Sequence, residues 1–315
     1  MRAREVTPLS PVTPEGVSSA LAIGAEIALE ADGVRLERRD WRWFLELPEE
    51  RIAFVAETEE DAVRLCRERE LLRRIASRVS FAVPRPLEQT AGAAVDVREK
   101  VRGLTGRALH DEALADPTRG RSLAEAMGRA LAELHAIPVA EVSGLLARGP
   151  LWPVPLSRMR ARLPGTTPAV LETQMLEALE HYDAIAADDA DLVLVHGDFG
   201  SHNFAFDSRT HALAGVFDFE EATLADYHAD FRYTPSYGEP ILLATIAAYE
   251  RHGGRPVSLS RVRLHHAMVA MSFLAWAVED PVVHERGTRR SWAQALTWVE
   301  QAVRAALELG PGGGA

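Results

Sequence analysis

Three polar residues follow two short apolar segments, at spacings that suit the transfer of a phosphoryl group. Asp198 and Asn203 come after the apolar run 192–195, and Asp218 follows the run 213–217 and precedes a Phe. Apolar runs of this length, bounded by polar turns, are typical of buried β-strands. We therefore expect two neighbouring strands to bring Asp198, Asn203 and Asp218 together.

The types of these three residues match the roles that phosphoryl transfer requires. Mg²⁺ bound to phosphates needs oxygen ligands, and Asn203 and Asp218 supply one neutral and one charged oxygen donor. Asp198 can orient an acceptor hydroxyl and accept its proton, provided that it stays ionised. An ordinary alternative is that these are polar turn residues after buried strands, where Asp and Asn are common. The ordered combination of fixed positions and a strand-borne Asp-Phe favours the catalytic interpretation.

The sequence around these residues resembles the aminoglycoside phosphotransferase family of small-molecule kinases. The shared motifs are 196–203 (HGDFGSHN), 215–220 (GVFDFE) and 225–231 (ADYHADF). In the last motif, Ala225 and Tyr227 replace a Gly and a Pro that the family usually has. The resemblance implies an α+β, bilobal protein-kinase-like fold, with a small antiparallel-sheet N-lobe and a larger, mainly helical C-lobe. It also implies that Asp230 braces the catalytic loop.

The resemblance divides the chain into four parts. These are an N-lobe with the nucleotide-binding sheet and helix at 1–98, a hinge at 99–103, a helical C-lobe with the catalytic and metal site at 104–309, and a disordered tail at 310–315. The N-lobe is similar to that of viomycin-type phosphotransferases, and the C-terminal part to macrolide and aminoglycoside phosphotransferases. A chain of 315 residues with 47% hydrophobic content can bury the cores of two lobes.

Hydrophobic patterning predicts the elements of the N-lobe. We expect a helix over 14–29, strands over 34–37, 41–47 and 52–55, and a second helix over 59–76. Apolar residues recur at helical spacing in the last segment, at Val63, Cys66, Leu72 and Ile75. Further apolar stripes predict later helices, among them one that includes Val170 and one that includes Trp292.

The lysine that kinases use to hold the α- and β-phosphates is missing from the strand before the second helix. Lys100 is the only lysine in the chain, and the strand segment 51–57 reads RIAFVAE. The resemblance makes Glu68 the helix glutamate that pairs with a cation on that strand. An arginine near the sheet would replace the lysine, and the candidates are Arg35, Arg38, Arg39, Arg42 and Arg51. The alternative is a degenerate nucleotide site in a regulatory or binding protein.

Other candidate binding residues follow from the resemblance. Backbone groups of Glu99, Lys100 and Val101 in the hinge would meet the nucleotide base. Substrate-recognising elements of this fold usually lie in the C-terminal helices, where acidic residues can bind ammonium groups and aromatic residues can pack on a ring. The candidates there are Glu220, Tyr237, Glu239, Trp276, Glu279 and Asp280. Each of them also fits a solvated acid or a core aromatic residue. We interpret His135 and the pair His265 and His266 as structural.

Composition excludes several classes of function. A formal net charge of -11 argues against a nucleic-acid partner, and it suits a cationic small molecule only weakly. Cys66 is the only cysteine, which excludes an intramolecular disulfide and a cysteine metal cluster. No segment resembles a membrane span or a signal peptide, so we expect a cytoplasmic protein.

Together these observations predict a Mg²⁺-dependent phosphotransferase that uses ATP or GTP to phosphorylate a hydroxyl of a small molecule. Modification of an antibiotic, either an aminoglycoside, a macrolide or a tuberactinomycin, is the leading role, with antibiotic resistance as its consequence. The nearest alternative is a metabolite kinase of the same fold that acts on choline, homoserine, fructosamines or methylthioribose. A non-catalytic protein that binds a nucleotide or another ligand is the third hypothesis.

Overall fold

The structure is a computed structural model. It describes residues 35–39, 42–47, 49–87, 95–105, 111, 114–149, 151–152, 154–185, 191–207, 209–210, 212–279 and 290–308. The described chain divides into two units: one contains the residues up to 76 and 83–102, and the other contains 77–82 and the residues from 103 onward. The expected helix at 14–29, the tail at 310–315 and Asp280 lie outside the described residues. Within the described part, no helix has the length and apolar content to cross a membrane.

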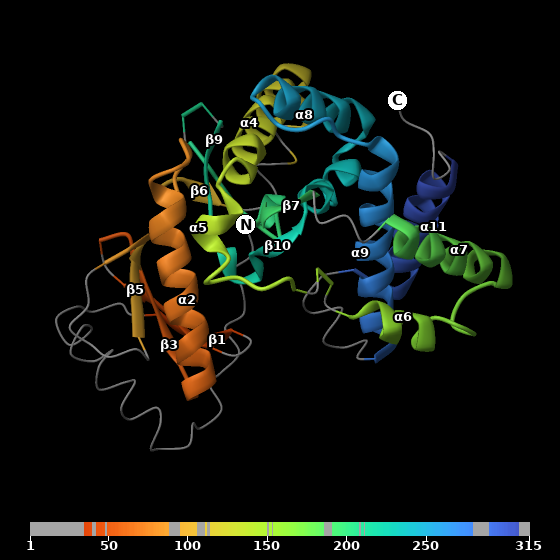
Figure 1. Ribbon diagram of the computed structural model, residues 1–315, viewed down its shortest axis with the longest axis horizontal. Coiled ribbons are helices and arrows are strands. Elements are labelled where there is room, and N and C mark those ends of the chain that lie inside the picture. Colours follow the sequence, from red (N-terminus) through yellow and green to blue (C-terminus); the bar gives the residue numbers. More distant parts are fainter. Residues whose placement is uncertain are drawn as a thin grey trace. The chain divides into compact units, whose positions relative to one another are not determined.

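A five-stranded antiparallel sheet forms the first unit together with one helix (Figure 1). Its strands, in spatial order, are β1 (Arg35–Arg39), β2 (Arg42–Leu47), β3 (Arg51–Ala56), β5 (Val95–Glu99) and β4 (Arg85–Pro86). Side chains alternate between the two faces, as the pleat of a strand requires. Phe44 and Phe54 lie on the face that packs against Leu65 of α2 (Glu59–Ala76), and Trp43 and Val55 lie on the other. The predicted strands and helix are confirmed.

The buried face of α2 differs from the predicted one. Leu72 and Ile75 are buried as expected, but Val63 is 64% exposed and Cys66 is also exposed. The helix turns Glu68 inward instead, where arginines from two strands bind its carboxylate. The buried ion pairs of Glu68 therefore share the inward face of this helix with its apolar residues, and apolar patterning predicted that face only in part.

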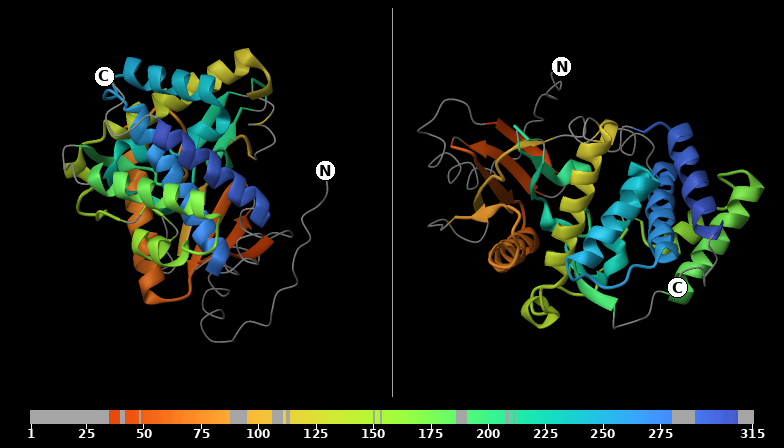
Figure 2. Two further views of the ribbon diagram at one scale, coloured as in Figure 1. Left: turned by 90° about the vertical axis from the view of Figure 1, so that its right-hand side faces the viewer. Right: turned by 90° about the horizontal axis from the view of Figure 1, so that it is seen from above.

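The second unit is mainly helical. Its long helices are α4 (Pro117–His135), α7 (Ala169–Ile185), α8 (Glu239–Arg251), α9 (Leu259–Glu279) and α11 (Trp292–Glu308), and its short ones are α5 (Val139–Val142) and α6 (Leu156–Arg162). Helix α4 packs along α8, and α7, α9 and α11 share a separate core, as Figures 1 and 2 show. Val170 and Trp292 are 73% and 41% exposed, so their predicted burial is wrong. Each lies in the first turn of its helix.

Short strands and 3-10 turns carry the polar motifs. Strand β7 (Leu192–Val195) pairs with β10 (Thr223–Asp226), and β8 (Phe204–Phe206) pairs with β6 (Leu104–Thr105) and β9 (Leu213–Val216). The 3-10 turns are η2 (Ser201–Asn203), η3 (Phe219–Glu221), η4 (Tyr227–Phe231) and η5 (Thr234–Tyr237). Asp198 follows β7 and Asp218 follows β9, each as predicted.

Gly128 allows α4 and α8 to approach closely. A Cβ at Gly128 would lie 2.5 Å from the carbonyl oxygen of Thr245 and 2.6 Å from the backbone nitrogen of Tyr249, both in α8. We expect Gly128→Ala to lower the free energy of unfolding by roughly 1–2 kcal/mol, because overpacking outweighs the gain in helix propensity. Urea unfolding followed by circular dichroism measures this. Gly144→Ala is the control, since nothing lies within 4 Å of its added Cβ, and equal losses in both variants would contradict the tight contact.

Candidate active site

The loop that follows β7 carries Asp198 and is held through its backbone. Gly197 has φ of 79°, and a Cβ there would lie 2.2 Å from the carbonyl oxygen of Glu221. Only glycine fits such a close, left-handed turn. The carboxylate of buried Asp230 accepts the backbone N–H of His196 at 2.8 Å and that of Gly197 at 3.0 Å. These contacts fix the chain directly before Asp198.

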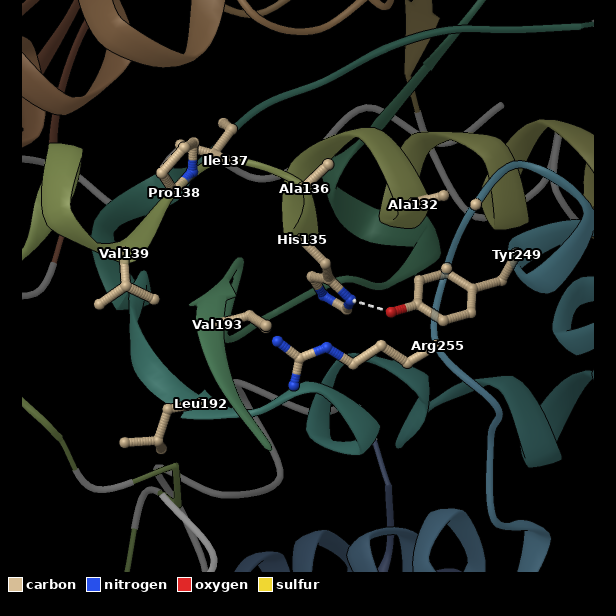
Figure 3. A pocket seen from close by; sticks show the side chains of 12 residues that line it. Ala132, His135, Ala136, Ile137, Pro138, Val139, Leu192, Val193, Tyr249 and Arg255 are labelled. Carbon is tan, nitrogen blue, oxygen red and sulfur yellow. Dashed lines mark hydrogen bonds between the residues drawn. The ribbon is translucent and has the colours of Figure 1, made fainter. Parts of the chain in front are cut away.

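Asp230 is itself bound by His135 at the end of α4. Nε2 of His135 lies 3.1 Å from Oδ2 of Asp230, and Nδ1 lies 3.1 Å from the hydroxyl oxygen of Tyr249 (Figure 3). Burial raises the pKa of Asp230, but the hydrogen bond and charge of His135, with the neighbouring His196, hold it below its ordinary value. The carboxylate is therefore ionised at neutral pH. Its contacts agree with the structural roles predicted for Asp230 and His135.

A pocket of about 300 Å³ lies beside this brace (Figure 3). Among the side chains that line it are Ala132, His135, Ile137, Val193, Tyr249 and Arg255. None of the residues predicted to bind a nucleotide, a metal or a substrate lines this pocket. It is therefore not the candidate active site.

The carboxylate of Asp198 is surrounded by donors. Nδ2 of Asn203 donates to Oδ2 of Asp198 at 2.9 Å and to its backbone oxygen at 3.0 Å, and Nε2 of His202 lies 2.7 Å from the same Oδ2. Burial alone would raise the pKa of Asp198, but the hydrogen bond and charge of His202, with the charge of Arg232, lower it below its ordinary value. Asp198 is thus ionised, as the acceptance of a proton requires.

Asp218 belongs to the same network of loops. The backbone N–H of Phe217 donates to the carbonyl oxygen of Asn203 at 3.0 Å, and Nε2 of His196 lies 3.1 Å from the carbonyl oxygen of Phe217. Asp218 has φ of 67° and ψ of 63°, a left-handed conformation that residues other than glycine rarely adopt. Such backbone strain is found preferentially at functional sites. The structure therefore joins Asp198 and Asn203 by hydrogen bonds and places Asp218 directly after Phe217, which bonds to Asn203 through its backbone.

Asn203 and Asp218 carry oxygen atoms of the kind that bind Mg²⁺. In the described part of the chain, no three or more His, Cys, Asp or Glu side chains form a group that could hold a metal. Mg²⁺ at a phosphoryl-transfer site commonly takes one or two protein oxygens and completes its shell with phosphates and water. Because the amide nitrogen of Asn203 faces Asp198, its amide oxygen is the atom left for a cation.

Three residues that contact this loop escaped the sequence analysis. A terminal guanidinium nitrogen of Arg232 donates to the carbonyl oxygen of Gly197, and its guanidinium carbon lies 5.1 Å from the ring centroid of Tyr233. The rings of His202 and Tyr233 are 5.9 Å apart. The one signal in the sequence was their position beside the motifs. His202 stands directly before Asn203, and Arg232 and Tyr233 follow the 225–231 segment.

The predicted hinge residues are engaged within the first unit. Glu99 forms an ion pair with Arg85, and Lys100 forms one with Glu46. The backbone N–H of Lys100 donates to the carbonyl oxygen of Glu50 at 2.8 Å. This donor is therefore already used within the first unit.

Val101, the third hinge residue, is buried.

Glu68 has two cationic partners, and neither of them is on the preceding strand. Its carboxylate binds Arg42 of β2 at 2.7 Å and Arg98 of β5 at 2.7 Å. The expected cation on β3 is therefore wrong, and the reason is the order of the strands: β2 and β5 flank β3 and direct their arginines toward α2.

Two of the predicted substrate residues already have partners in the protein. Glu239 pairs with Arg263 at 2.9 Å. Glu279 pairs with Arg158 at 2.9 Å and with Arg162 at 2.7 Å. An ammonium group of a substrate would have to compete with these arginines.

The other predicted substrate residues differ in their surroundings. The hydroxyl of Tyr237 accepts the backbone N–H of Ser201 at 3.0 Å, so it touches the catalytic loop. Glu220 is half-buried in η3, directly after the strand end that carries Asp218. Trp276 packs on Phe273, with ring centroids 6.0 Å apart, against the core of α7, α9 and α11. The structure thus brings Tyr237 and Glu220 near the loop network and leaves Trp276 in the helical core.

Comparison with known proteins supplies the family. Residues 29–265 match the model of the phosphotransferase enzyme family, APH. The chain belongs to this family. Its membership confirms the resemblance that the motifs around Asp198 and Asp218 indicated. Among curated proteins, none matches this sequence.

Solved structures with the same fold include aminoglycoside and macrolide phosphotransferases. The GDP complex of aminoglycoside 2'-phosphotransferase-IIIa has a TM-score of 0.66 at 15% identity, over 91% of this chain and 98% of that one. Macrolide 2'-phosphotransferase MphH from Brachybacterium faecium has a TM-score of 0.58 at 18% identity, over 93% and 98%. The complex of APH(2")-IIa with streptomycin and ATP has a TM-score of 0.62 at 16% identity, over 95% and 99%. These similarities confirm the predicted protein-kinase-like fold.

We expect Asp230→Asn to lower the free energy of unfolding by about 2–4 kcal/mol, because it places an N–H₂ group against backbone donors. The folded-state pKa of Asp230 is below its ordinary value. Its stabilising effect is therefore fully present above a pH of about 4 and is lost as the pH falls through the folded-state pKa. Urea unfolding across this range should show a difference between parent and variant that shrinks in acid.

The control for this measurement is Glu177→Gln, at an exposed carboxylate of α7. It should unfold like the parent at every pH. A difference between Asp230→Asn and the parent that does not change with pH would contradict an ionised brace.

Proposed function

We propose that this protein transfers the γ-phosphate of ATP or GTP to a hydroxyl group of a small molecule. The observation that carries the proposal is the hydrogen bond between Asn203 and Asp198, with Asp218 next to a residue that bonds to Asn203, in a chain of the phosphotransferase enzyme family. A network of ordinary turn residues would have no need of an ionised, half-buried Asp198 beside two further oxygen donors. A non-catalytic binding protein is disfavoured for the same reason.

The geometry of the loop gives each residue a role. Asp198 accepts a hydrogen bond from the acceptor hydroxyl and takes its proton as the hydroxyl oxygen bonds to the γ-phosphorus. The bond from the γ-phosphorus to the bridging oxygen breaks, and ADP or GDP leaves. Asn203 and Asp218 would hold Mg²⁺, which when bound neutralises charge on the phosphate oxygens. The low pKa of Asp198 suits a base that must be ionised before the acceptor arrives.

The choice of donor and the division of the chain are parts of the same proposal. Structures with this fold contain GDP and ATP, which supports a nucleoside triphosphate as the donor. We assign nucleotide binding to residues 1–98 and the hinge 99–103, and the transfer site to 104–309. A cytoplasmic location, where both nucleotides are available, fits this chemistry.

For the acceptor, we propose an antibiotic first and a metabolite second. Proteins of similar structure have been solved with kanamycin and with streptomycin, which supports an aminoglycoside or a related antibiotic, and hence a role in antibiotic resistance. The ion pairs of Glu239 and Glu279 favour the metabolite, because these acids already have arginine partners. A small acceptor with few or no ammonium groups would not compete with those arginines.

The test is the transfer of radiolabelled γ-phosphate from ATP and from GTP. The acceptor panel contains aminoglycosides, macrolides, tuberactinomycins, choline, homoserine, a fructosamine and methylthioribose. We expect Asp198→Ala to lower kcat on the accepted substrate by about 10²–10⁴-fold, because it removes the general base. Asp207→Asn, in the turn between β8 and β9, is the control and should transfer phosphate like the parent.

Two outcomes would reject the proposal. Transfer by Asp198→Ala at the rate of the parent would show that Asp198 is not the base. A parent protein whose melting temperature is unmoved by millimolar Mg-ATP and Mg-GTP would not be a kinase.

A further inference from the structure

A cluster of buried charges lies on the face of the N-terminal sheet that α2 covers. The antiparallel register places Phe54 of β3 opposite Asp96 of β5, with Arg42 and Arg98 on the same face. The guanidinium carbon of Arg42 lies 4.0 Å from the ring centroid of Phe54, and that of Arg98 lies 4.7 Å from it. An aromatic ring therefore stands on β3 between the two cations that bind Glu68.

Two of the three guanidinium nitrogens of Arg98 are held by carboxylates. Nε donates to Oδ2 of Asp96 at 2.7 Å, and Nη1 donates to Oε1 of Glu68 at 2.7 Å. Nη2 is buried and has no hydrogen-bond partner in the described part of the chain. A buried donor without an acceptor costs about 1–3 kcal/mol. An acceptor bound to Nη2 would remove this cost.

Further charged groups of the described residues meet at this cluster. Arg42, Arg69 and Arg98 face the carboxylates of Glu68 and Asp96, with Nε of Arg69 3.7 Å from Oδ1 of Asp96. Burial raises the pKa of Glu68, but Arg98 and Arg42 lower it to about 2. Burial raises the pKa of Asp96 above its ordinary value, so this carboxylate neutralises the arginines less readily.

We propose that Arg98, supported by Arg42, binds the α- or β-phosphate of the nucleotide in place of the lysine that the chain lacks. A phosphate oxygen supplies the acceptor that Nη2 lacks. Planar guanidinium groups suit phosphate oxygens particularly well. Because Nη2 is covered in the free protein, the atoms around it must shift when the phosphate binds. The inference rests on the proposed function and adds to it the residue that holds the donor.

The other candidate arginines fit this role less well. Arg51 on β3 pairs with Glu49 at 3.2 Å, in a partly exposed position. The side chains of Arg35, Arg38 and Arg39 lie outside the described residues. Arg98, at the end of β5, was not among the arginines considered from the sequence.

A series of ligands that differ only in their phosphates tests the inference. Isothermal titration calorimetry on the full chain, with Mg²⁺ present, gives the affinities for adenosine, ADP and ATP and for the guanosine series. In the parent, affinity should rise sharply from the nucleoside to the diphosphate. In Arg98→Lys this rise should shrink by about 10-fold or more, while nucleoside affinity stays unchanged. The reason is that one ammonium group does not have the fork geometry to bind Asp96, Glu68 and a phosphate oxygen together. Arg64→Lys is the matched control: Arg64 pairs with Glu60 at 2.7 Å on the same helix as Glu68.

The outcomes separate this inference from the proposed function. If the parent binds diphosphates and the rise is unchanged in both Arg98→Lys and Arg42→Lys, the phosphate role of the arginines is wrong and the kinase proposal stands. If the parent binds no nucleotide, the kinase proposal fails, and the inference fails with it.

A crystal structure of the parent with Mg²⁺ and ADP or GDP decides the matter if the variants do not fold. We expect a phosphate oxygen within hydrogen-bonding distance of Nη2 of Arg98, while Nε and Nη1 keep their bonds to Asp96 and Glu68. Phosphates held by other residues, with the surroundings of Nη2 unchanged, would overturn the inference.

Discussion

The buried carboxylate of Asp230 is the group on which the geometry of the candidate active site depends. It accepts two consecutive backbone N–H groups, from His196 and Gly197, and it is bound in turn by His135 of α4. One ionised side chain thus joins η4, the end of β7 and a helix from a distant part of the sequence. Without it, two donors in a tight glycine turn would be buried and unsatisfied, which native structures rarely tolerate. Asp198 follows this turn directly, so its direction is set by the brace.

A neutral histidine then links the two strands that Asp198 and Asp218 follow. Nδ1 of His196 accepts the backbone N–H of Asp198 at 3.1 Å, and Nε2 lies 3.1 Å from the carbonyl oxygen of Phe217. Burial lowers the pKa of His196, despite nearby carboxylates that oppose this. The neutral ring has one donor and one acceptor, which are the two roles that these contacts require. His196 therefore holds the end of β9, and with it Asp218, against the loop of Asp198.

Local patterns in the sequence predicted the features that depend on residues close together in the chain. Period-2 and helical apolar patterns predicted the strands around Phe44 and Phe54 and the bounds of α2, and motif spacing predicted which residues meet at the loop. The face of α2 and the partners of Glu68 could not be predicted in this way. Both depend on arginines 26 and 30 residues away, which reach Glu68 only once the sheet has its register. The contacts of Arg232 with the catalytic loop likewise need the folded second unit.

The burial of Glu68 also explains why arginine is a better partner for it than lysine. A lysine buried at the same depth would tend to lose its proton, because burial disfavours the charged form and the ammonium pKa falls readily. Burial likewise opposes the charge of Arg98, but Glu68 and Asp96 raise its pKa above an already high ordinary value. The guanidinium also has enough donors to satisfy two carboxylates and still keep one nitrogen unused. A lysine bound to Glu68 alone would need more polar surroundings to keep its charge. The aromatic ring of Phe54 and the flanking arginines together suit a sheet face that excludes water.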